Sequence, residues 1–186
     1  MSGRDIFKKY SKLLNAFYFF YNLFPDFLSY ILLNIFNFGK VGFLLRYFEL
    51  KKSSEFVGEN VYIAKKCVFK NLKYFSCGIN LSIHEFCYID AAGGIEIGDN
   101  VSIAHNCSLV SFEHTWENLE IPIKYNPTKL NSIKIGNDVW LGCGVRVLAG
   151  TVIEDRVIVA AGAVVKGTLE SGYLYGGIPA KKLKKL

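Results

Sequence analysis

The sequence predicts a mainly β protein built as a parallel β-helix, with an N-terminal helical segment and one extruded loop. Three observations predict this architecture: a six-residue repeat over much of the chain, a concentration of aromatic residues before it, and one irregular stretch inside it. A chain of 186 residues corresponds to one domain, or to one domain with an appendage. Its 51% hydrophobic residues suffice for a core, and its 20% charged residues argue against disorder.

The first fifty residues differ in composition from the rest, because they hold 15 of the 28 aromatic residues. Polar residues and one proline interrupt the apolar runs, so none reaches the ~18 residues of a membrane-spanning helix. The small-residue cleavage site that a signal peptide needs does not follow. We predict two short helices within residues 1–52, broken near Pro25. They either pack on the rest of the protein or in a trimer, or lie on a membrane surface.

From Ile135 the chain divides into six consecutive rows: "IGNDVW", "LGCGVR", "VLAGTV", "IEDRVI", "VAAGAV" and "VKGTLE". The first position of every row is aliphatic, and the fifth is small, aliphatic or threonine. A helical period does not keep this register. A period of six is typical of a β-helix in which each row forms one side of a triangular coil. We expect the first and fifth side chains of each row to point into the prism.

The same register holds less regularly upstream, over 57–74 and 83–114, with two extra residues in 89–96. Cys67, Cys87 and Cys107 fall on the fifth position, so we predict them to be small buried core residues. The five cysteines are odd in number and include no CxxC pair, which argues against a disulfide framework and a zinc site. They suit a reducing compartment.

The repeat stops at "SFEHTW" and resumes about twenty residues later. A long irregular loop that interrupts a regular scaffold is commonly functional. We therefore expect a β-helix over 53–180 that extrudes an irregular loop at 112–132. Residues 181–186 form a basic tail with four lysines, in a chain whose net charge is +6. Such a tail attracts nucleic acid, membrane headgroups or a phosphorylated ligand, or is simply solvated.

Four segments in this order carry a more specific signal: "IEIGDNVSIAHNCSLVSFEHTW", "IGNDVWLGCGVRVLAGTVI", "AAGAVV" and "GGIPAKKL". Over residues 57–186 the chain resembles the hexapeptide-repeat acyltransferases with a left-handed parallel β-helix. Within that family, it resembles the branch of the galactoside and maltose O-acetyltransferases and their polysaccharide O-acetyltransferase relatives. The resemblance implies a cytoplasmic homotrimer with active sites between subunits, acetyl-CoA as acyl donor, no metal and no nucleic-acid partner. The aromatic N-terminal segment adds contact with the inner face of the membrane as a further hypothesis.

In that family the histidine of the loop is the general base. It corresponds to His114, because the spacing from "IGDN" to His114 matches the spacing in the family. A neutral imidazole can take the proton of a sugar hydroxyl as its oxygen attacks the thioester, with no acyl-enzyme. Without the resemblance, a surface histidine at a loop entrance fits as well. Trp116 and Trp140 are predicted in the acceptor site, although Trp140 is also compatible with packing. His84 stands where the galactoside enzymes have an asparagine, so it lies near the acceptor or on the coil surface; His105 is expected to point outward.

The resemblance also implies a donor site of eight residues: Gly142, Cys143, Ala160, Ala161, Gly162, Lys166, Lys181 and Lys184. The backbone N–H of Cys143, after "WLG", would bind the oxyanion. The small residues of "AAGAVV" would let the pantetheine arm approach the backbone. Lys166 stands one position away from the family's cofactor-binding lysine. Lys181 and Lys184 match basic positions that meet the phosphates of coenzyme A.

Other functions stay open. A γ-type carbonic anhydrase shares the coil and binds a metal with three histidines, but His84, His105 and His114 lack the close pair those enzymes use. A non-enzymatic β-helix subunit would have lost the base and the CoA tail, which this chain retains. An acetyltransferase of an antibiotic, serine or an amino sugar keeps the chemistry and changes the acceptor. The acceptor favoured here is a sugar hydroxyl of a surface polysaccharide, or of its nucleotide- or lipid-linked precursor.

Overall fold

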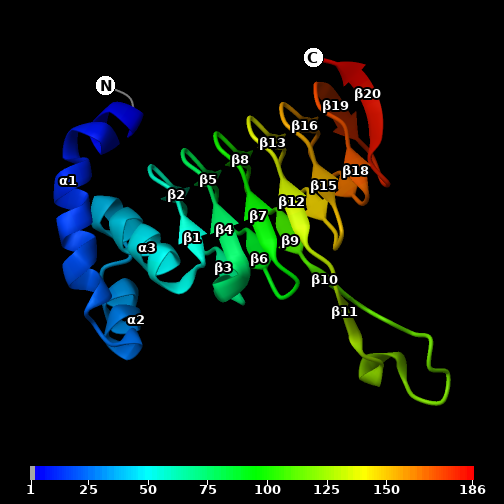
Figure 1. The fold of residues 1–186 in the computed structure, drawn as a ribbon, viewed down its shortest axis with the longest axis horizontal. Helices are drawn as coiled ribbons and strands as arrows, with labels where there is room; N and C mark the ends of the chain where they lie inside the picture. The colour runs from blue at the N-terminus through cyan, green and yellow to red at the C-terminus, as the bar shows by residue number, and fades with distance from the viewer. Residues whose placement is uncertain (1–2) are drawn as a thin grey trace.

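A computed structural model describes the backbone of residues 3–186 and the side chains of residues 9–29 and 31–186. Its body is a prism with parallel sheets on its three sides, which we call sheets A, B and C (Figure 1). In each coil the chain passes from sheet A to sheet B, then to sheet C and back to A. This confirms the predicted left-handed parallel β-helix, and the helices lie at its N-terminal end.

The strands are short and lie in register from coil to coil. Sheet A comprises β1 (Phe56–Val57), β4 (Phe75–Cys77), β7 (Ile95–Ile97), β12 (Ile133–Ile135), β15 (Val152–Ile153) and β18 (Thr168–Leu169). Sheet B comprises β2 (Tyr62–Ile63), β5 (Ser82–Ile83), β8 (Ser102–Ile103), β13 (Trp140–Leu141), β16 (Ile158–Val159), β19 (Tyr173–Gly176) and β20 (Lys181–Lys185). Sheet C comprises β3 (Val68–Lys70), β6 (Tyr88–Asp90), β9 (Ser108–Val110), β14 (Arg146–Val147) and β17 (Val164–Val165).

The first and fifth positions of the rows fill the prism, as the repeat predicts. All six first-position residues from Ile135 to Val165 are buried, and so are all six fifth-position residues from Val139 to Leu169. Full burial of one such aliphatic side chain contributes roughly 1.5–3 kcal/mol. Because each coil repeats the same inward positions, the core is a continuous column along the prism.

The fifth-position cysteines form a stack of thiols along this column. Cys87 and Cys107 are buried as predicted, whereas Cys67 in the first coil is only partly buried. Each thiol donates to a carbonyl of the next coil: Cys67 to His84 at 3.1 Å, and Cys87 to Ala104 at 3.2 Å. Each cysteine therefore fills a small space in the core, and its weak S–H donor has a carbonyl acceptor.

The coils differ in length at one corner. We call the corner between sheets A and B the first, that between B and C the second, and that between C and A the third. Along sheet A, Phe56 pairs with Ser76 and Ser76 with Glu96, so the first two coils are equally long. Glu96 then pairs with Lys134, and Lys134 with Val152. The third corner absorbs these differences, with the 3-10 helix η1 (Leu72–Tyr74) in the first coil and the extruded loop in the third coil.

Three helices precede the prism, whereas the sequence predicts two. α1 (Gly3–Asn22) ends before Pro25, as expected, and α2 (Asp26–Ile35) follows it. A second break separates α2 from α3 (Gly39–Ser53). Gly39 has a φ of +53° there, a left-handed conformation that glycine adopts without a Cβ penalty. The prediction of two helices is wrong because this second break carries no proline.

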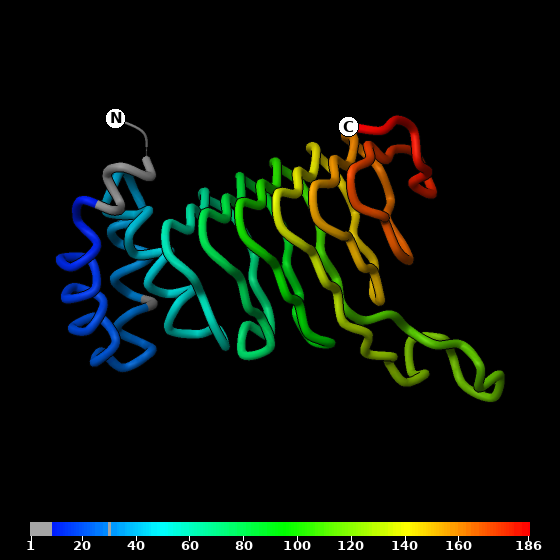
Figure 2. The backbone as a smooth tube through the Cα atoms, turned by 45° about the horizontal axis from the view of Figure 1, so that its top comes forward, coloured from blue at the N-terminus to red at the C-terminus, as the bar shows by residue number. Residues whose placement is uncertain are grey.

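The three helices, which we call the helical cap, close the N-terminal end of the prism (Figure 2). α3 lies against the first coil, where Arg46 Nε donates to the carbonyl of Ile63 at 2.8 Å. α1 packs outside α3, with the rings of Tyr18 and Tyr21 each 5.5 Å from that of Phe48. The cap therefore covers the coil end whose backbone groups would otherwise be unpaired.

The loop expected to be irregular contains strands, and so does the basic tail. Residues 112–132, which we call the arm, begin and end as an antiparallel ladder of β10 (Phe112–His114) and β11 (Thr128–Leu130), with the 3-10 helix η2 (Ile123–Tyr125) between them. The basic tail is almost wholly β20, which pairs antiparallel with β19. β11 and β20 do not follow the six-residue period, so the repeat gives no signal for them.

Candidate active site

His114 ends strand β10, at the point where the arm leaves the third corner. It pairs with Thr128 of β11, and the next residue, Thr115, donates from its backbone N–H to the Pro127 carbonyl at 3.1 Å. The Thr115 hydroxyl donates to the same carbonyl at 2.7 Å. The His114 side chain is exposed, with its ring 6.4 Å from that of Phe112. A short, well-paired ladder thus fixes the backbone of a solvent-accessible imidazole.

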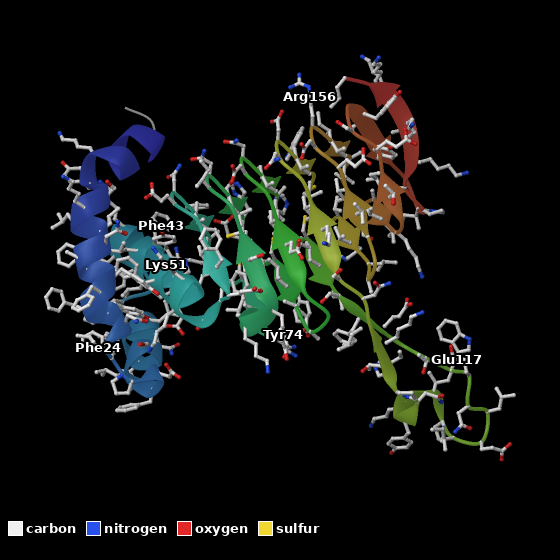
Figure 3. The ribbon with its side chains drawn as sticks, in the orientation of Figure 1. Phe24, Phe43, Lys51, Tyr74, Glu117 and Arg156 are labelled. Atoms are coloured by element: carbon white, nitrogen blue, oxygen red, sulfur yellow. The ribbon has the colours of Figure 1, made fainter. Side chains whose placement is uncertain are left out.

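The rest of the arm projects away from the prism, as the labelled Glu117 shows (Figure 3). Asn126 is buried and organises the outer part, because its side chain accepts from the Asn118 N–H at 3.1 Å and donates to the Asn118 carbonyl at 3.2 Å. Several large apolar side chains of the arm are exposed: Trp116, Leu119, Ile123, Tyr125 and Leu130. An ordered arm with an apolar surface is suited to contact with another molecule.

Lys166 lies on the same corner as His114. Its Nζ is 3.4 Å from Oε2 of Glu113, the residue directly before His114. Lys166 is predicted in the donor site, whereas Glu113 is not among the predicted residues. The sequence marks Glu113 only by its position next to the histidine. The structure therefore brings Lys166 to the base of the arm.

Five of the predicted donor-site residues lie at the second corner, on successive coils. Gly142 N–H donates to the Val159 carbonyl and Gly162 N–H to the Cys143 carbonyl, both at 2.8 Å, which stacks "LGC" on "AAG". A Cβ on Gly142 would lie 2.7 Å from the backbone nitrogen of Ala161, so glycine is needed for this close approach. Within residues 3–186 the N–H of Cys143 has no hydrogen-bond acceptor. It is a donor that an incoming oxygen could use.

His84 occupies the same second corner, two coils nearer the helical cap. Its ring is 5.7 Å from that of Tyr62, which is in turn 5.1 Å from the ring of Phe43 on α3. Nδ1 of His84 lies 4.0 Å from a carboxylate oxygen of Glu85. His105 is exposed, as expected. The described residues contain no group of three or more His, Cys, Asp or Glu side chains that could hold a metal ion.

Trp140 lies on the outer face of sheet B, where 52% of it is exposed. It pairs in register with Ser102 on one side and Ile158 on the other. Trp140, Asp138 and Arg156 line a cavity of about 430 Å³ that the C-terminal Leu186 also borders. Arg156 Nη1 is 3.2 Å from Asp138 Oδ2. Trp140 is therefore not a core residue of this chain, although part of its indole is covered.

The basic strand β20 carries two kinds of lysine. Lys182 lies 2.7 Å from a carboxylate oxygen of Glu170 and 4.1 Å from the ring centre of Tyr173. Lys181 and Lys184 are exposed and form no ion pair with any residue in the described part of the chain. Both predicted phosphate-binding lysines are therefore available for an anionic ligand, as is the exposed Lys185.

The predicted site residues do not converge in one chain. His114, Trp116 and Lys166 belong to the arm and the third corner, whereas the small residues of the donor site lie at the second corner. Sheet C separates these two corners. Trp140 is farther away still, because sheet B is the side of the prism opposite the third corner (Figure 1).

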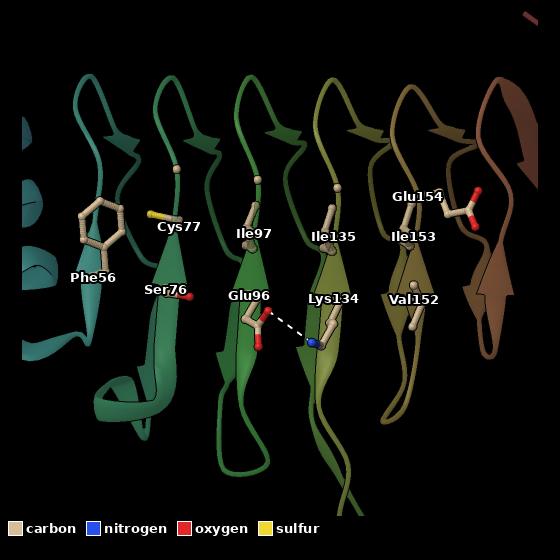
Figure 4. A pocket seen from close by; sticks show the side chains of 13 residues that line it. Phe56, Ser76, Cys77, Glu96, Ile97, Lys134, Ile135, Val152, Ile153 and Glu154 are labelled. Carbon is tan, nitrogen blue, oxygen red and sulfur yellow. Dashed lines mark ion pairs between the residues drawn. The ribbon is translucent and has the colours of Figure 1, made fainter.

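Two further features were not predicted. Asp90 is buried beneath the base of the arm, where its Oδ1 accepts from Asn71 Nδ2 at 2.7 Å and its Oδ2 lies 3.4 Å from the Tyr88 hydroxyl. The two extra residues of 89–96 are the sequence signal for this turn. A groove of about 480 Å³ runs over the outer face of sheet A, crossed by the 3.5 Å ion pair of Lys134 and Glu96 (Figure 4). None of the predicted site residues lines this groove.

The six-residue repeat of the coils also relates the chain to known proteins. Residues 132–167 match the family "Bacterial transferase hexapeptide (six repeats)". A dTDP-4-amino-4,6-dideoxy-D-glucose acyltransferase of Escherichia coli is 30% identical over 155 residues, covering 69% of this chain and 81% of that protein. The chain belongs to the hexapeptide-repeat acyltransferases. The Escherichia coli K12 protein named "Putative lipopolysaccharide biosynthesis O-acetyl transferase WbbJ" is 31% identical over 113 residues, which cover 57% of this chain and 58% of WbbJ.

Solved structures carry the same fold. A maltose O-acetyltransferase from Clostridium difficile 630 superposes with a TM-score of 0.74 at 24% identity, covering 86% of this chain and 84% of that one. AntD, an N-acyltransferase from Bacillus cereus solved with dTDP and 3-hydroxybutyryl-CoA, gives 0.59 at 26% identity and covers 74% of this chain and 86% of AntD. The hexapeptide-repeat chain spans 30% and 58% of the lengths of the first two curated relatives it matches.

Proposed function

We propose that the protein is an acetyl-CoA-dependent O-acetyltransferase that acetylates a sugar hydroxyl, with His114 as general base. One observation carries the proposal: an otherwise continuous β-helix opens once to form a long ordered arm, and an exposed histidine stands where the arm leaves. The family relationship supports acyl transfer, and AntD provides an example of a relative that binds an acyl-CoA.

The proposed chemistry needs a base, an oxyanion donor and a binding surface for the acyl donor. His114 accepts the proton of the sugar hydroxyl while the hydroxyl oxygen attacks the thioester carbonyl of acetyl-CoA. The N–H of Cys143 donates to the oxygen that becomes negative. When the carbon–sulfur bond breaks, His114 returns its proton to the leaving thiolate, which departs as coenzyme A. No nucleophilic serine or cysteine is required, because the hydroxyl attacks directly.

The fit of the acyl donor rests on the second corner and on β20. Gly162 has open space around its Cα, and Ala160 and Ala161 add no bulk, so an extended pantetheine arm could pass beside them. Lys181 and Lys184 supply unpaired positive charge for the nucleotide phosphates. Lys166, paired with Glu113, would contact the donor from the side of the base.

The active enzyme would be a homotrimer, with each site formed where the third corner of one subunit meets the second corner of the next. The separation of His114 from Cys143 by sheet C supports this assembly, because a threefold ring would repeat one such contact three times. The exposed apolar residues of the arm would lie against the neighbouring subunit. Trp116 and Trp140, which are far apart in one chain, could then border the same acceptor site.

The proposed acceptor is a hydroxyl of a surface polysaccharide or of its nucleotide- or lipid-linked precursor, and the relationship to WbbJ supports it. Five cysteines without a disulfide suit the cytoplasm, where we place the enzyme. A second candidate is acylation of the amino group of a nucleotide-linked amino sugar, because the relative that establishes the family is named for such a substrate.

Thiol release from acetyl-CoA tests the proposal against a panel of sugars, nucleotide sugars, amino sugars and polysaccharide repeats. His114→Ala and, as a matched control, His105→Ala are assayed beside the natural protein. Loss of a general base costs about 10²–10⁴-fold in rate. We expect that loss for His114→Ala and none for His105→Ala. Turnover of amino sugars alone would select the second candidate, and undiminished turnover by His114→Ala would refute the assignment of the base.

A further inference from the structure

Helix α1 has two apolar faces, and the described part of the chain covers one of them. The inner face carries Tyr18 and Tyr21, which pack on Phe48 of α3. A neighbouring face carries four exposed side chains at intervals of three and four residues, Tyr10, Leu13, Phe17 and Phe20, and the exposed Phe24 follows just after the helix ends. The labelled Phe24, just after α1, projects away from the prism (Figure 3). A helix that is apolar on both faces is stable in water only if both are covered.

Helix α2 adds three exposed residues spaced by four positions: Phe27, Ile31 and Ile35. We call these eight residues of α1, α2 and the turn between them the outer apolar face. Single exposed apolar side chains are ordinary on a protein surface, but eight of them within two consecutive helices and their turn mark an interaction site.

The charge of the cap identifies the kind of partner. Residues 1–53 contain eight basic and three acidic residues. Of the acidic groups, Asp26 pairs with Lys52 at 2.8 Å, and Glu49 accepts from the Tyr21 hydroxyl at 2.8 Å, so both are engaged within the cap. Lys9 and Lys12 are exposed at the start of α1, beside the apolar stripe. Aromatic and aliphatic residues flanked by exposed lysines suit a surface of anionic lipid headgroups.

We propose that the outer apolar face docks the protein on a membrane that carries anionic lipids, with α1 lying in the interface. No helix in the described residues is long and apolar enough to cross a membrane, so the contact would be peripheral. The docking itself does not depend on the chemistry proposed for His114. In the proposed trimer, rotation about an axis along the prism would turn three caps toward one plane, and their binding would reinforce each other.

The position of the cap links docking to the substrate, and this step rests on the proposed function. Phe43, Tyr62 and His84 form a chain of ring contacts from α3 to the second corner. Successive coils are about 5 Å apart, so His84 lies roughly 10 Å from the cap. A sugar attached to a lipid in the docked membrane would therefore be close to the acceptor side of the site.

Sedimentation with vesicles tests the docking. The full chain is mixed with vesicles of phosphatidylcholine alone, or with 30% phosphatidylglycerol, at about 0.1 M salt, where surface charges are still effective. We expect binding to the anionic vesicles and much weaker binding to the neutral ones. Phe20→Gln should weaken binding about tenfold, because it removes an aromatic side chain from the interface. Lys9→Gln with Lys12→Gln should weaken it by about fivefold for each lysine.

Phe56→Gln is the matched control, because Phe56 is 61% exposed and Phe20 is 63% exposed, but Phe56 lies on sheet A outside the cap. It should bind vesicles like the natural protein. Circular dichroism melting checks that each variant is folded.

Absence of vesicle binding by the folded natural protein would overturn the proposal, as would equal losses in Phe20→Gln and Phe56→Gln. Light scattering that shows paired trimers separated by Phe20→Gln, without vesicle binding, would assign the face to a second copy instead. Turnover of soluble acceptors is measured in parallel, so failure of docking and failure of the proposed chemistry are distinguished.

Discussion

Lys166 Nζ lies 3.4 Å from Glu113 Oε2, and this ion pair joins the base of the arm to the third corner of a coil farther along the prism. The two side chains are 62% and 38% exposed, so the pair contributes no more than about 1 kcal/mol to stability. Its importance lies in position, since Glu113 directly precedes His114. The pair restrains the strand that carries the proposed base.

Glu113→Gln should therefore lower kcat more than it lowers stability. Small errors in the placement of a catalytic group reduce rates, and we expect a loss of about threefold to tenfold, with the KM for acetyl-CoA unchanged. Lys166→Ala should lower kcat similarly and also raise that KM, because the lysine is proposed to meet the donor. Steady-state kinetics separate the two effects. Equal KM values in both variants would remove Lys166 from the donor site.

The stacking of the second corner predicts unequal costs for two glycine substitutions. In Gly142→Ala the new Cβ would meet backbone atoms of the next coil at 2.7 and 2.9 Å, so we expect a destabilisation of about 3 kcal/mol. Gly162 has a φ of +71°, and a Cβ added there would have no atom within 4 Å, so Gly162→Ala should cost only about 1 kcal/mol of backbone strain. Denaturant unfolding without acetyl-CoA measures both. A larger cost at Gly162 would contradict the packing of this corner.

The thiols should react unequally with iodoacetamide at pH 8, because the thiolate is the reactive form. Burial raises the pKa of Cys77 to about 12, and contact with the Cys107 thiol raises the pKa of Cys87 to about 11. Both thiols stay protonated at pH 8 and become reactive only as the pH approaches these values. Partly exposed Cys143 should be alkylated first in the folded protein, as peptide mass analysis can show.

Acetyl-CoA should slow this alkylation of Cys143, because the proposed donor site places the thioester beside its backbone N–H. A nonhydrolysable acetyl-CoA analogue serves equally, and adenosine alone is the control that should give little protection. If Cys143 reacts at the same rate with saturating donor, the second corner is not the thioester site.

Neutralising Lys181 and Lys184 together should raise the KM for acetyl-CoA, because the exposed pair has no partner within the described residues. Each charge-assisted contact to phosphate contributes roughly 1.5–3 kcal/mol, so a rise of at least tenfold is expected. Lys185→Gln, on the same strand, is the matched control and should change the KM little. An equal rise in the control would indicate a general effect of positive charge.

The six-residue period predicts most of the fold, because one aliphatic position every sixth residue specifies both the strand and its inward face. The break between α2 and α3 was missed, since a turn at Asn37–Gly39 carries a weaker signal than Pro25. The strand β20 was missed because its pairing with β19 depends on backbone contacts between distant residues. Of the site, the sequence predicts the residue types. It does not predict that His114 and Cys143 lie on different corners, since that depends on how three sheets close into a prism.

Subunit complementation tests the central claim that each active site combines two copies of the chain. His114→Ala lacks the base, and Ala161→Trp places an indole where the pantetheine arm would pass, on an exposed residue outside the core. Each variant alone should be inactive. Co-expressed and randomly mixed in equal amounts, they should regain about one quarter of the natural activity, because about one interface in four of a symmetric trimer pairs an intact base with an intact donor site. Mixtures that stay inactive, although mass analysis shows mixed trimers, would place the whole site within one chain and contradict the account.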